Sequence, residues 1–154
     1  MREECSKRDF FSLYTTPEIA DAFGRFWDNE NGVQDKFAAF WQHVAKRFDR
    51  NPNVIGYDII NEPFTANMYK DSMLFADRKK FDREVLTPFY AKIAKEIREV
   101  DDLHIIFFEP TQFPDVIPLN GGIVNNVGFE GIIEGDDYRN RTVLDDHLYC
   151  CFME

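Results

Sequence analysis

The sequence predicts an α/β fold in which parallel strands alternate with helices, as they do in an α/β barrel. Two apolar runs, residues 54–60 and 103–108, have the length and apolar content of buried strands, and a helical pattern precedes each of them. Alternation of this kind implies crossover connections and therefore a parallel sheet. Both runs end at a Glu-Pro pair, and proline cannot continue the hydrogen-bond ladder of a strand.

The first half of the chain is predicted to contain two helices. The first covers residues 17–28, with Thr16 as its N-cap and Pro17 at its first position, and residues 29–32 break it. The second covers residues 33–49. Its broad apolar face repeats at helical spacing and consists of Phe37, Phe40, Trp41, Val44, Ala45 and Phe48.

The second half is predicted to contain one long helix and a short third strand. Residues 64–78 are expected to form an irregular loop, and residues 79–100 a helix that Pro88 kinks or divides, because proline removes a backbone hydrogen bond. Residues 111–141 are rich in Pro, Gly and Asn and show little periodicity. The third strand covers residues 143–149.

Composition limits the classes of protein to which the chain can belong. Its 154 residues, 44% of them hydrophobic, suffice for one domain but fall short of the roughly 250 residues of a complete (β/α)₈ barrel. The formal net charge of −10 argues against nucleic-acid binding, which requires a basic surface. The chain has neither an apolar run of about 18 residues for a membrane span nor the apolar core of a signal peptide. The protein is then intracellular, or its true N-terminus is missing.

The cysteines and the motif pattern predict neither a metal nor a cofactor. Cys5, Cys150 and Cys151 are an odd set with two adjacent members, which is neither a zinc pattern nor a disulfide framework. One disulfide and free thiols both remain open. The sequence contains no His/Cys/Asp cluster with metal-ligand spacing and no Gly-rich phosphate loop.

Glu62, at the end of the first predicted strand, is a candidate general acid. A carboxylate at the C-terminal end of a parallel strand lies where α/β barrels build their active sites. Partial burial there would raise its pKa, as protonation of a glycosidic oxygen requires. A solvated or helix-capping glutamate is the alternative. Asn61 would bind a sugar hydroxyl or support the turn. Asp58, which shares a strand face with Glu62, is assigned a structural role.

Three further residues are candidates, and two histidines are not. Glu109 repeats the Glu-Pro pattern. It would pair with the first glutamate as a nucleophile or, as we favour, be a rim carboxylate that binds substrate or backbone amides. His147 and Tyr149 share one strand face, where the histidine could bind a sugar and the tyrosine could orient a carboxylate. A half-buried aromatic pair is the alternative. His43 and His104 are interpreted as packing residues.

The stretch NPNVIGYDIINEP, residues 51–63, closely resembles the strand-4 signature of glycoside hydrolase family 5. Within that family the sequence is most similar to the endoglycoceramidases. Supporting stretches are FAAFWQHVAKRFDR (37–50), FFEP (107–110) and HLYC (147–150), so the resemblance covers most of the chain. It implies that residues 1–154 are a partial catalytic domain, a fragment of a (β/α)₈ TIM barrel that carries strands 4 to 6 with their flanking helices.

The resemblance also implies a function and residue roles. Glu62 matches the general acid/base, Asn61 the neighbour that contacts the sugar 2-hydroxyl, and His147 and Tyr149 the strand-6 pair that lines the site. The family's mechanism is retaining. The substrate would be an oligosaccharide or, for an endoglycoceramidase, a glycosphingolipid cut between glucose and ceramide. The alternatives are a fragment of a family 5 β-glucanase or cellulase, and a non-catalytic truncated product.

The same resemblance implies that catalytic parts are missing. The family's nucleophile lies on strand 7, whereas the sequence stops at Glu154, soon after the predicted strand 6. We therefore expect these residues alone not to hydrolyse glycosides, and we expect an open barrel to be weakly stable or to self-associate. Family habit implies a secreted or lysosomal-like location. The loop from Met68 to Phe75 is apolar enough to suit a lipid tail.

Overall fold

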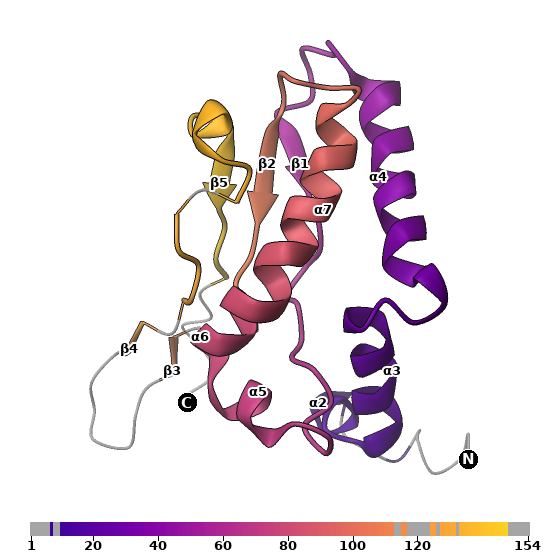
Figure 1. Cartoon of the computed structure of the whole chain (residues 1–154), viewed down its shortest axis with the longest axis vertical. Helices are drawn as coiled ribbons and strands as arrows, with labels where there is room; N and C mark the ends of the chain where they lie inside the picture. Colours follow the sequence, from indigo (N-terminus) through magenta and orange to yellow (C-terminus); the bar gives the residue numbers. More distant parts are fainter. Residues whose placement is uncertain are drawn as a thin grey trace.

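The structure is a computed structural model that describes residues 7, 10–112, 115–116, 124–125, 127–131 and 133–147. Figure 1 shows how its helices and strands are arranged. In chain order the elements are α2 (Phe10–Tyr14), α3 (Pro17–Trp27), η1 (Glu30–Gly32), α4 (Val33–Phe48), β1 (Gly56–Asp58), α5 (Ser72–Ala76), α6 (Arg78–Phe81), η2 (Asp82–Leu86), α7 (Thr87–Arg98), β2 (Ile105–Phe108), β3 (Asp115–Val116), β4 (Val124–Asn125), η3 (Asp136–Tyr138) and β5 (Thr142–Leu144).

The predicted parallel sheet is confirmed. Its strand order is β1-β2-β5, and both pairs are parallel, with Tyr57 opposite Ile106 and Phe107 opposite Val143. Strands β1 and β2 are shorter than the apolar runs that predicted them, because their regular pairing covers only residues 56–58 and 105–108. Residues 148–149 of the predicted third strand lie outside the described residues. All three strands run in one direction, so their carboxyl ends meet at one edge of the sheet.

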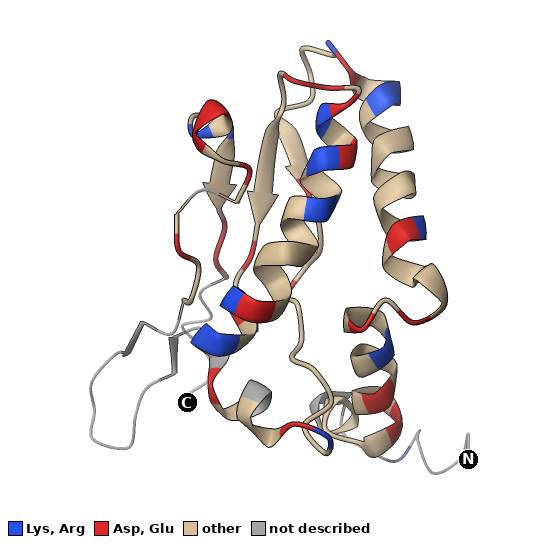
Figure 2. Cartoon of the chain, in the orientation of Figure 1, with Lys and Arg blue, Asp and Glu red and all other residues tan. Residues whose placement is uncertain are grey.

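Helices α4 and α7 pack against each other beside the sheet (Figure 1), and α7 contributes more of the buried core residues than any other element. The buried side chains include Phe81, Leu86, Phe89, Tyr90, Ile93 and Ile97, together with Trp27 from α3. Trp27 and Phe89 meet edge to face, with ring centroids 5.1 Å apart, which is a favoured aromatic geometry. Figure 2 shows acidic and basic residues mixed along the outer side of α7.

Several sequence predictions need correction. Thr16 lies at the N-cap of α3, but its hydroxyl donates to the carbonyl of Leu13 and not to an amide of the helix. Phe40 is 55% exposed, because α4 packs on its neighbours through small residues such as Ala38 and Ala45. The loop 64–78 contains the short helix α5, and the segment 111–141 contains the antiparallel pair β3–β4 and the turn η3.

Pro88 divides the predicted long helix as expected. A π-helical turn, η2, separates α6 from α7, and Pro88 lies in the first turn of α7. Proline leaves a carbonyl of the preceding turn without a donor, and a local π-turn is a common way to accommodate this defect. The hydroxyl of Thr87 donates to the carbonyl of Asp82 at 2.8 Å and satisfies part of that turn.

The π-turn also anchors the loop that follows β2. The carboxylate of Asp82 is buried and accepts the backbone N–H groups of Thr111 and Gly128, each at 2.9 Å. The hydroxyl of Thr111 then donates to the carbonyl of Pro63 at 3.2 Å. A side chain at Gly128 would come within 2.2 Å of the Lys79 carbonyl, so only glycine fits there. The ends of β1 and β2 are thereby joined.

His104 is buried, as a packing residue should be, but it takes part in a polar network near the start of β2. Asp101 accepts hydrogen bonds from the Tyr57 hydroxyl at 2.6 Å and from the backbone N–H of His104 at 3.1 Å, and it also contacts the His104 ring. Burial alone would raise the pKa of Asp101, but the hydrogen bonds from Tyr57, His104 and Leu103 outweigh it and hold that pKa below its usual value. The network lies at the opposite end of the strands from Glu62.

Within the described residues, no helix is both long enough and apolar enough to cross a membrane.

Candidate active site

The carboxyl ends of the three strands bring Glu62 and His147 together. Glu62 follows β1, Glu109 follows β2, and His147 follows β5. The Nδ1 atom of His147 lies 2.9 Å from Oε1 of Glu62, although 85 positions separate the two residues in the sequence. Pairing of β5 with β2 continues past Leu144, since the backbone N–H of Asp145 donates to the carbonyl of Phe108 at 2.9 Å. This extension fixes where His147 leaves the sheet.

Glu62 has an unusual backbone conformation. Its φ is 45°, in the left-handed region that residues other than glycine seldom adopt. Its N–H donates to Oε2 of Glu109 at 2.9 Å, and its side chain is 20% exposed, so it is half sheltered. The side-chain amide of Gln112 donates to its Oε2 at 3.3 Å. Glu62, which follows the end of β1 at Asp58, thus presents a hydrogen-bonded carboxylate at the edge of the sheet.

Glu109 is the buried member of the group. Its side chain is 3% exposed, and its Oε1 atom has no hydrogen-bond partner. Burial raises the pKa of the Glu109 carboxyl, while the hydrogen bond from the N–H of Glu62 and the charge of His147 act in the opposite direction. Our favoured interpretation, a rim carboxylate that binds substrate or backbone amides, is confirmed for the amide of Glu62 but wrong in its placement, because the side chain is buried.

The side chain of Tyr90, in α7, holds the backbone of Glu109 in place. Its hydroxyl donates to the carbonyl of Glu109 at 2.9 Å and accepts the N–H of Glu109 at 3.1 Å. Burial, together with nearby carboxylates, raises the pKa of Tyr90 well above its usual value, so it stays a neutral hydroxyl. A single side chain therefore satisfies both backbone groups of the residue that supports Glu62.

Replacing Tyr90 with Phe should destabilise the fold measurably. The variant leaves the N–H and the carbonyl of Glu109 buried without partners, at an expected cost of about 1–3 kcal/mol in the free energy of unfolding. Urea denaturation of both chains measures this difference. Tyr69→Phe is a matched control, because its hydroxyl donates to the carbonyl of Thr15 at an exposed position. Equal stability of the two variants would contradict the role given to Tyr90.

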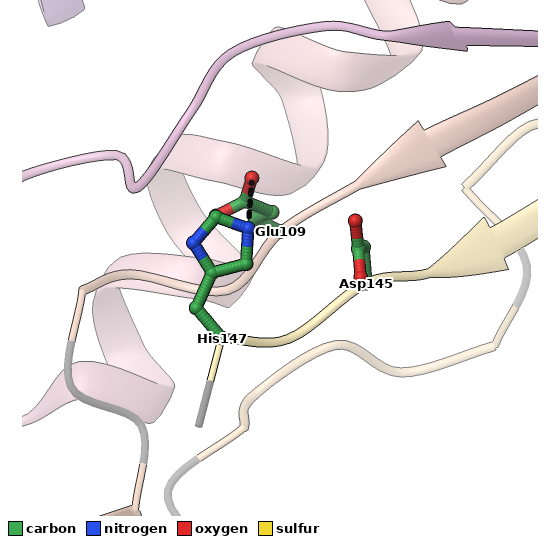
Figure 3. Close-up of side chains that lie close together, drawn as sticks. All are labelled: Glu109, Asp145 and His147. Atoms are coloured by element: carbon green, nitrogen blue, oxygen red, sulfur yellow. Dashed lines mark ion pairs between the residues drawn. The ribbon is translucent and has the colours of Figure 1, made fainter. Parts of the chain in front are cut away.

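His147 faces several carboxylates. Its hydrogen bond to Glu62 raises the pKa of its imidazole above the usual value, against the effect of burial, and the charges of Glu109 and Asp145 add to the rise. Its Nε2 lies 3.6 Å from Oε1 of Glu109. Figure 3 shows the His147 ring over Glu109, with Asp145 beside them on the strand end. The imidazole is thus suited to carry a proton between acidic groups.

The raised pKa of His147 predicts a pH dependence of stability. A protonated group with a higher pKa in the folded state stabilises that state fully below its unfolded pKa of about 6.5. The contribution disappears as the pH rises through the folded pKa. We expect urea titrations to show that His147→Asn is less stable than the parent chain at pH 5.5 and that the difference shrinks at pH 8.5. A difference that grows with pH would contradict this sign.

Glu109, Asp145 and His147 could together offer ligands to a metal ion. One ligand atom from each lies within 4.8 Å of the other two. Mixed carboxylate and imidazole groups suit zinc and similar divalent ions, but acidic clusters of this kind are common without an ion. Sequence spacing could not reveal the group, because its members come from two different strands.

Asn61 faces a different part of the site. It is exposed and, with Glu62 and Pro63, borders a hollow of about 510 Å³. Most of the remaining lining is apolar and consists of Tyr14, Ile19, Ala22, Phe23, Phe26, Trp27, Phe37, Ile60 and Phe64. No described hydrogen bond joins Asn61 to His147. Tyr149, Cys5, Cys150 and Cys151 lie outside the described residues.

Three residues around the site were missed by the sequence analysis. Asp145 precedes His147 by two positions, so strand alternation could have placed both on one face. Gln112 lies in the loop after Glu109 and carries no pattern that predicts its contact with Glu62. Tyr90 belongs to the apolar face of a helix, where nothing in the sequence distinguishes it from a core aromatic residue.

Comparisons with known proteins show the family to which the chain is similar. Residues 19–150 match the family described as Cellulase (glycosyl hydrolase family 5). The chain is 37% identical over 147 residues to the endoglycoceramidases of Cyanea nozakii and Hydra vulgaris, covering 96% of this chain but 27% and 26% of those proteins.

Solved structures give the same result. Endo-glycoceramidase II from Rhodococcus sp. in its ganglioside GM3 complex matches with a TM-score of 0.71 and 25% identity, over 93% of this chain and 29% of that one. Its lactosyl-enzyme intermediate matches with a TM-score of 0.70 and 26% identity, over 93% and 31%. The chain spans about a quarter of the length of the curated relatives that it matches. With its family match over most of its residues, the chain belongs to glycosyl hydrolase family 5.

Proposed function

We propose that this chain supplies the acid/base part of a retaining glycosidase that cuts glycosphingolipids between glucose and ceramide. The observation that carries the proposal is Glu62, a half-sheltered carboxylate at the end of β1 that is hydrogen-bonded to His147. Similar proteins support the proposal: the relatives from Cyanea nozakii and Hydra vulgaris are endoglycoceramidases, and the similar enzyme from Rhodococcus sp. binds the ganglioside GM3.

In the proposed reaction Glu62 acts twice. As an acid it protonates the oxygen that leaves with ceramide, while a separate carboxylate attacks the anomeric carbon. As a base it then takes a proton from the water that releases the sugar. The Rhodococcus enzyme forms a lactosyl-enzyme intermediate, which is the kind of covalent species that this mechanism requires. Asn61 would contact the sugar 2-hydroxyl, and Tyr149 would lie near the nucleophile.

A second candidate is a β-glucanase or cellulase activity. The matched family carries the description Cellulase, and the Rhodococcus enzyme also binds a cellobiose-like isofagomine. The apolar hollow next to Asn61 and Glu62 favours a lipid-bearing substrate over a soluble glucan. Both candidates use the same acid/base residue and differ in what occupies the leaving-group side.

The isolated chain should not hydrolyse glycosides. It covers about a quarter of the length of its curated relatives, and a retaining mechanism needs two carboxylates in one site. Loss of one member of such a pair lowers rates by several powers of ten. The measurement is release of fluorophore from an aryl lactoside by the purified 154-residue chain. Turnover that disappears in Glu62→Gln would overturn this expectation.

The function itself is tested in a completed barrel, defined here as the Hydra vulgaris endoglycoceramidase in which this chain replaces the segment it matches. The unaltered Hydra enzyme is the control. We expect a cooperatively folded completed barrel to release ceramide from ganglioside GM3 and to leave a soluble β-glucan intact. Hydrolysis of the glucan alone would favour the second candidate. A folded barrel inactive on both substrates would favour a non-catalytic product and contradict the proposal.

A further inference from the structure

We propose that Glu109 is a positioning residue that holds Glu62 and His147 in one closed arrangement at the ends of three strands. The inference rests on the proposed function, because it gives Glu109 a part in presenting the acid/base of that reaction. It assigns no proton transfer to Glu109 itself. The residue would act through its neighbours and would not touch the substrate.

The three residues form a closed triangle. Oε2 of Glu109 accepts the backbone N–H of Glu62 at 2.9 Å, and Oε1 of Glu109 lies 3.6 Å from Nε2 of His147. The third side is the 2.9 Å contact between Nδ1 of His147 and Oε1 of Glu62. A protonated imidazole has an N–H donor on each ring nitrogen, so His147 can direct one donor toward Glu62 and the other toward Glu109. Each corner of the triangle follows a different strand, β1, β2 or β5.

The negative charge of Glu109 is compensated by the nearby imidazolium of His147. The Glu109 side chain is 3% exposed, and its Oε1 atom has no hydrogen bond. A buried carboxylate oxygen is unfavourable unless a donor or a positive charge lies nearby. The His147 imidazolium provides that charge, and the other acidic groups that act on it are Glu62 and Asp145. Without the charge of Glu109, His147 would hold its proton less firmly and would bind Glu62 more weakly.

The amide contact fixes the other end of Glu62. Glu62 has a positive φ, and its N–H donates to the carboxylate of Glu109. The backbone of Glu109 is in turn held by the Tyr90 hydroxyl. Glu62 is therefore held at its main chain by Glu109 and at its carboxylate by His147. A residue that is fixed at both ends keeps its carboxyl group beside the position that the leaving oxygen must occupy.

The first test measures the coupling directly. Glu109→Gln keeps the size and an acceptor oxygen for the amide of Glu62 but removes the charge. Histidine NMR titrations follow His147, one of three histidines in the chain. We expect His147 to titrate at clearly lower pH in Glu109→Gln, and Glu109→Asp to restore part of the shift. An unchanged His147 titration in a folded Glu109→Gln chain would overturn the inference.

Asp145→Asn is the matched control. Asp145 also acts on His147 through its charge, but it makes a smaller contribution than Glu109 and does not bind the amide of Glu62. Its effect on the His147 titration should therefore be the smaller one. Thermal melts of both variants establish that the fold is retained. If Asp145→Asn shifts His147 as much as Glu109→Gln does, a general loss of negative charge explains the result and Glu109 has no special role.

The second test uses the completed barrel and separates positioning from support of the fold. Misplacement of a reacting group by about 1 Å can cost roughly 100-fold in rate. We expect Glu109→Gln to lower kcat about 10- to 100-fold on ganglioside GM3, with KM little changed. The loss in kcat/KM, which reports the first step alone, should be much smaller on a dinitrophenyl lactoside, whose leaving group needs no proton. Equal losses on both substrates would overturn the inference.

The two tests separate failure of the inference from failure of the proposed function. An active completed barrel whose Glu109→Gln variant keeps its full kcat would reject the inference and leave the proposed function intact. A folded but inactive barrel would reject the proposed function. The NMR titration would still report whether Glu109 governs His147 in this chain.

Discussion

Replacing Glu62 with Gln should lower kcat of the completed barrel on ganglioside GM3 by about 10²- to 10⁴-fold, the usual contribution of a general acid/base. The substitution keeps the size of the side chain and an oxygen that can accept from His147, so the fold should be retained. It removes the proton that the leaving oxygen needs and the base that activates water. The measurement is ceramide release at a series of substrate concentrations, with thermal melts to verify folding.

A matched control for this substitution is Glu130→Gln. Glu130 is a surface residue that pairs with Arg83 at 3.6 Å, and its side chain is 77% exposed. Its replacement removes one negative charge without touching the strand ends, so ceramide release should be unchanged. If Glu62→Gln keeps its activity within a few-fold of this control, Glu62 does not act as the acid/base.

Replacing Arg98 with Met should have the largest effect on stability, about 3–5 kcal/mol in the free energy of unfolding. Arg98 and Glu134 form a two-pronged ion pair, with N–O distances of 2.6 and 3.1 Å and side chains only 7% and 2% exposed. The variant leaves the Glu134 carboxylate buried without its cation. It also removes the donor to the carbonyl of His104.

Asp136→Asn provides the comparison for that prediction. Asp136 pairs with Arg139 at 2.7 Å in the same segment, but their side chains are 84% and 69% exposed, and exposed pairs contribute little. Urea denaturation midpoints should fall strongly for Arg98→Met and hardly at all for Asp136→Asn. Similar midpoints would mean that the buried pair is not what joins this segment to α7. Because the segment leads into β5, we also expect the His147 signal to move in Arg98→Met.

The parts of the fold that the sequence predicted are those controlled by local patterns. Pro63 cannot extend a strand, and so the sequence placed Glu62 beyond the end of β1, although β1 itself ends earlier, at Asp58. Pro88 likewise predicted a divided helix, and the structure has a π-turn just before the helix that contains Pro88. The helical periodicity of residues 33–49 located α4 almost to the residue.

The errors arose where tertiary packing decides the outcome. Phe40 fits the apolar stripe of α4 but stays exposed, because the contact surface of the helix is centred on Ala38 and Ala45. The apolar run 54–60 is longer than β1, since only three of its residues pair with β2. The contact of His147 with Glu62 joins residues far apart in the sequence, and the burial of Glu109 depends on the helix that carries Tyr90. No local pattern encodes such contacts.

The most direct test of the role of Glu62 is the response of the completed barrel carrying Glu62→Ala to azide, with a dinitrophenyl lactoside as substrate. This leaving group departs without a proton, so the covalent sugar–enzyme species forms and then waits for a base that is missing. Azide needs no base; it attacks the anomeric carbon and displaces the enzyme carboxylate. We predict that azide accelerates turnover and that the product is lactosyl azide of retained configuration. Azide without effect, or a product of inverted configuration, would contradict the assignment of Glu62 as the acid/base.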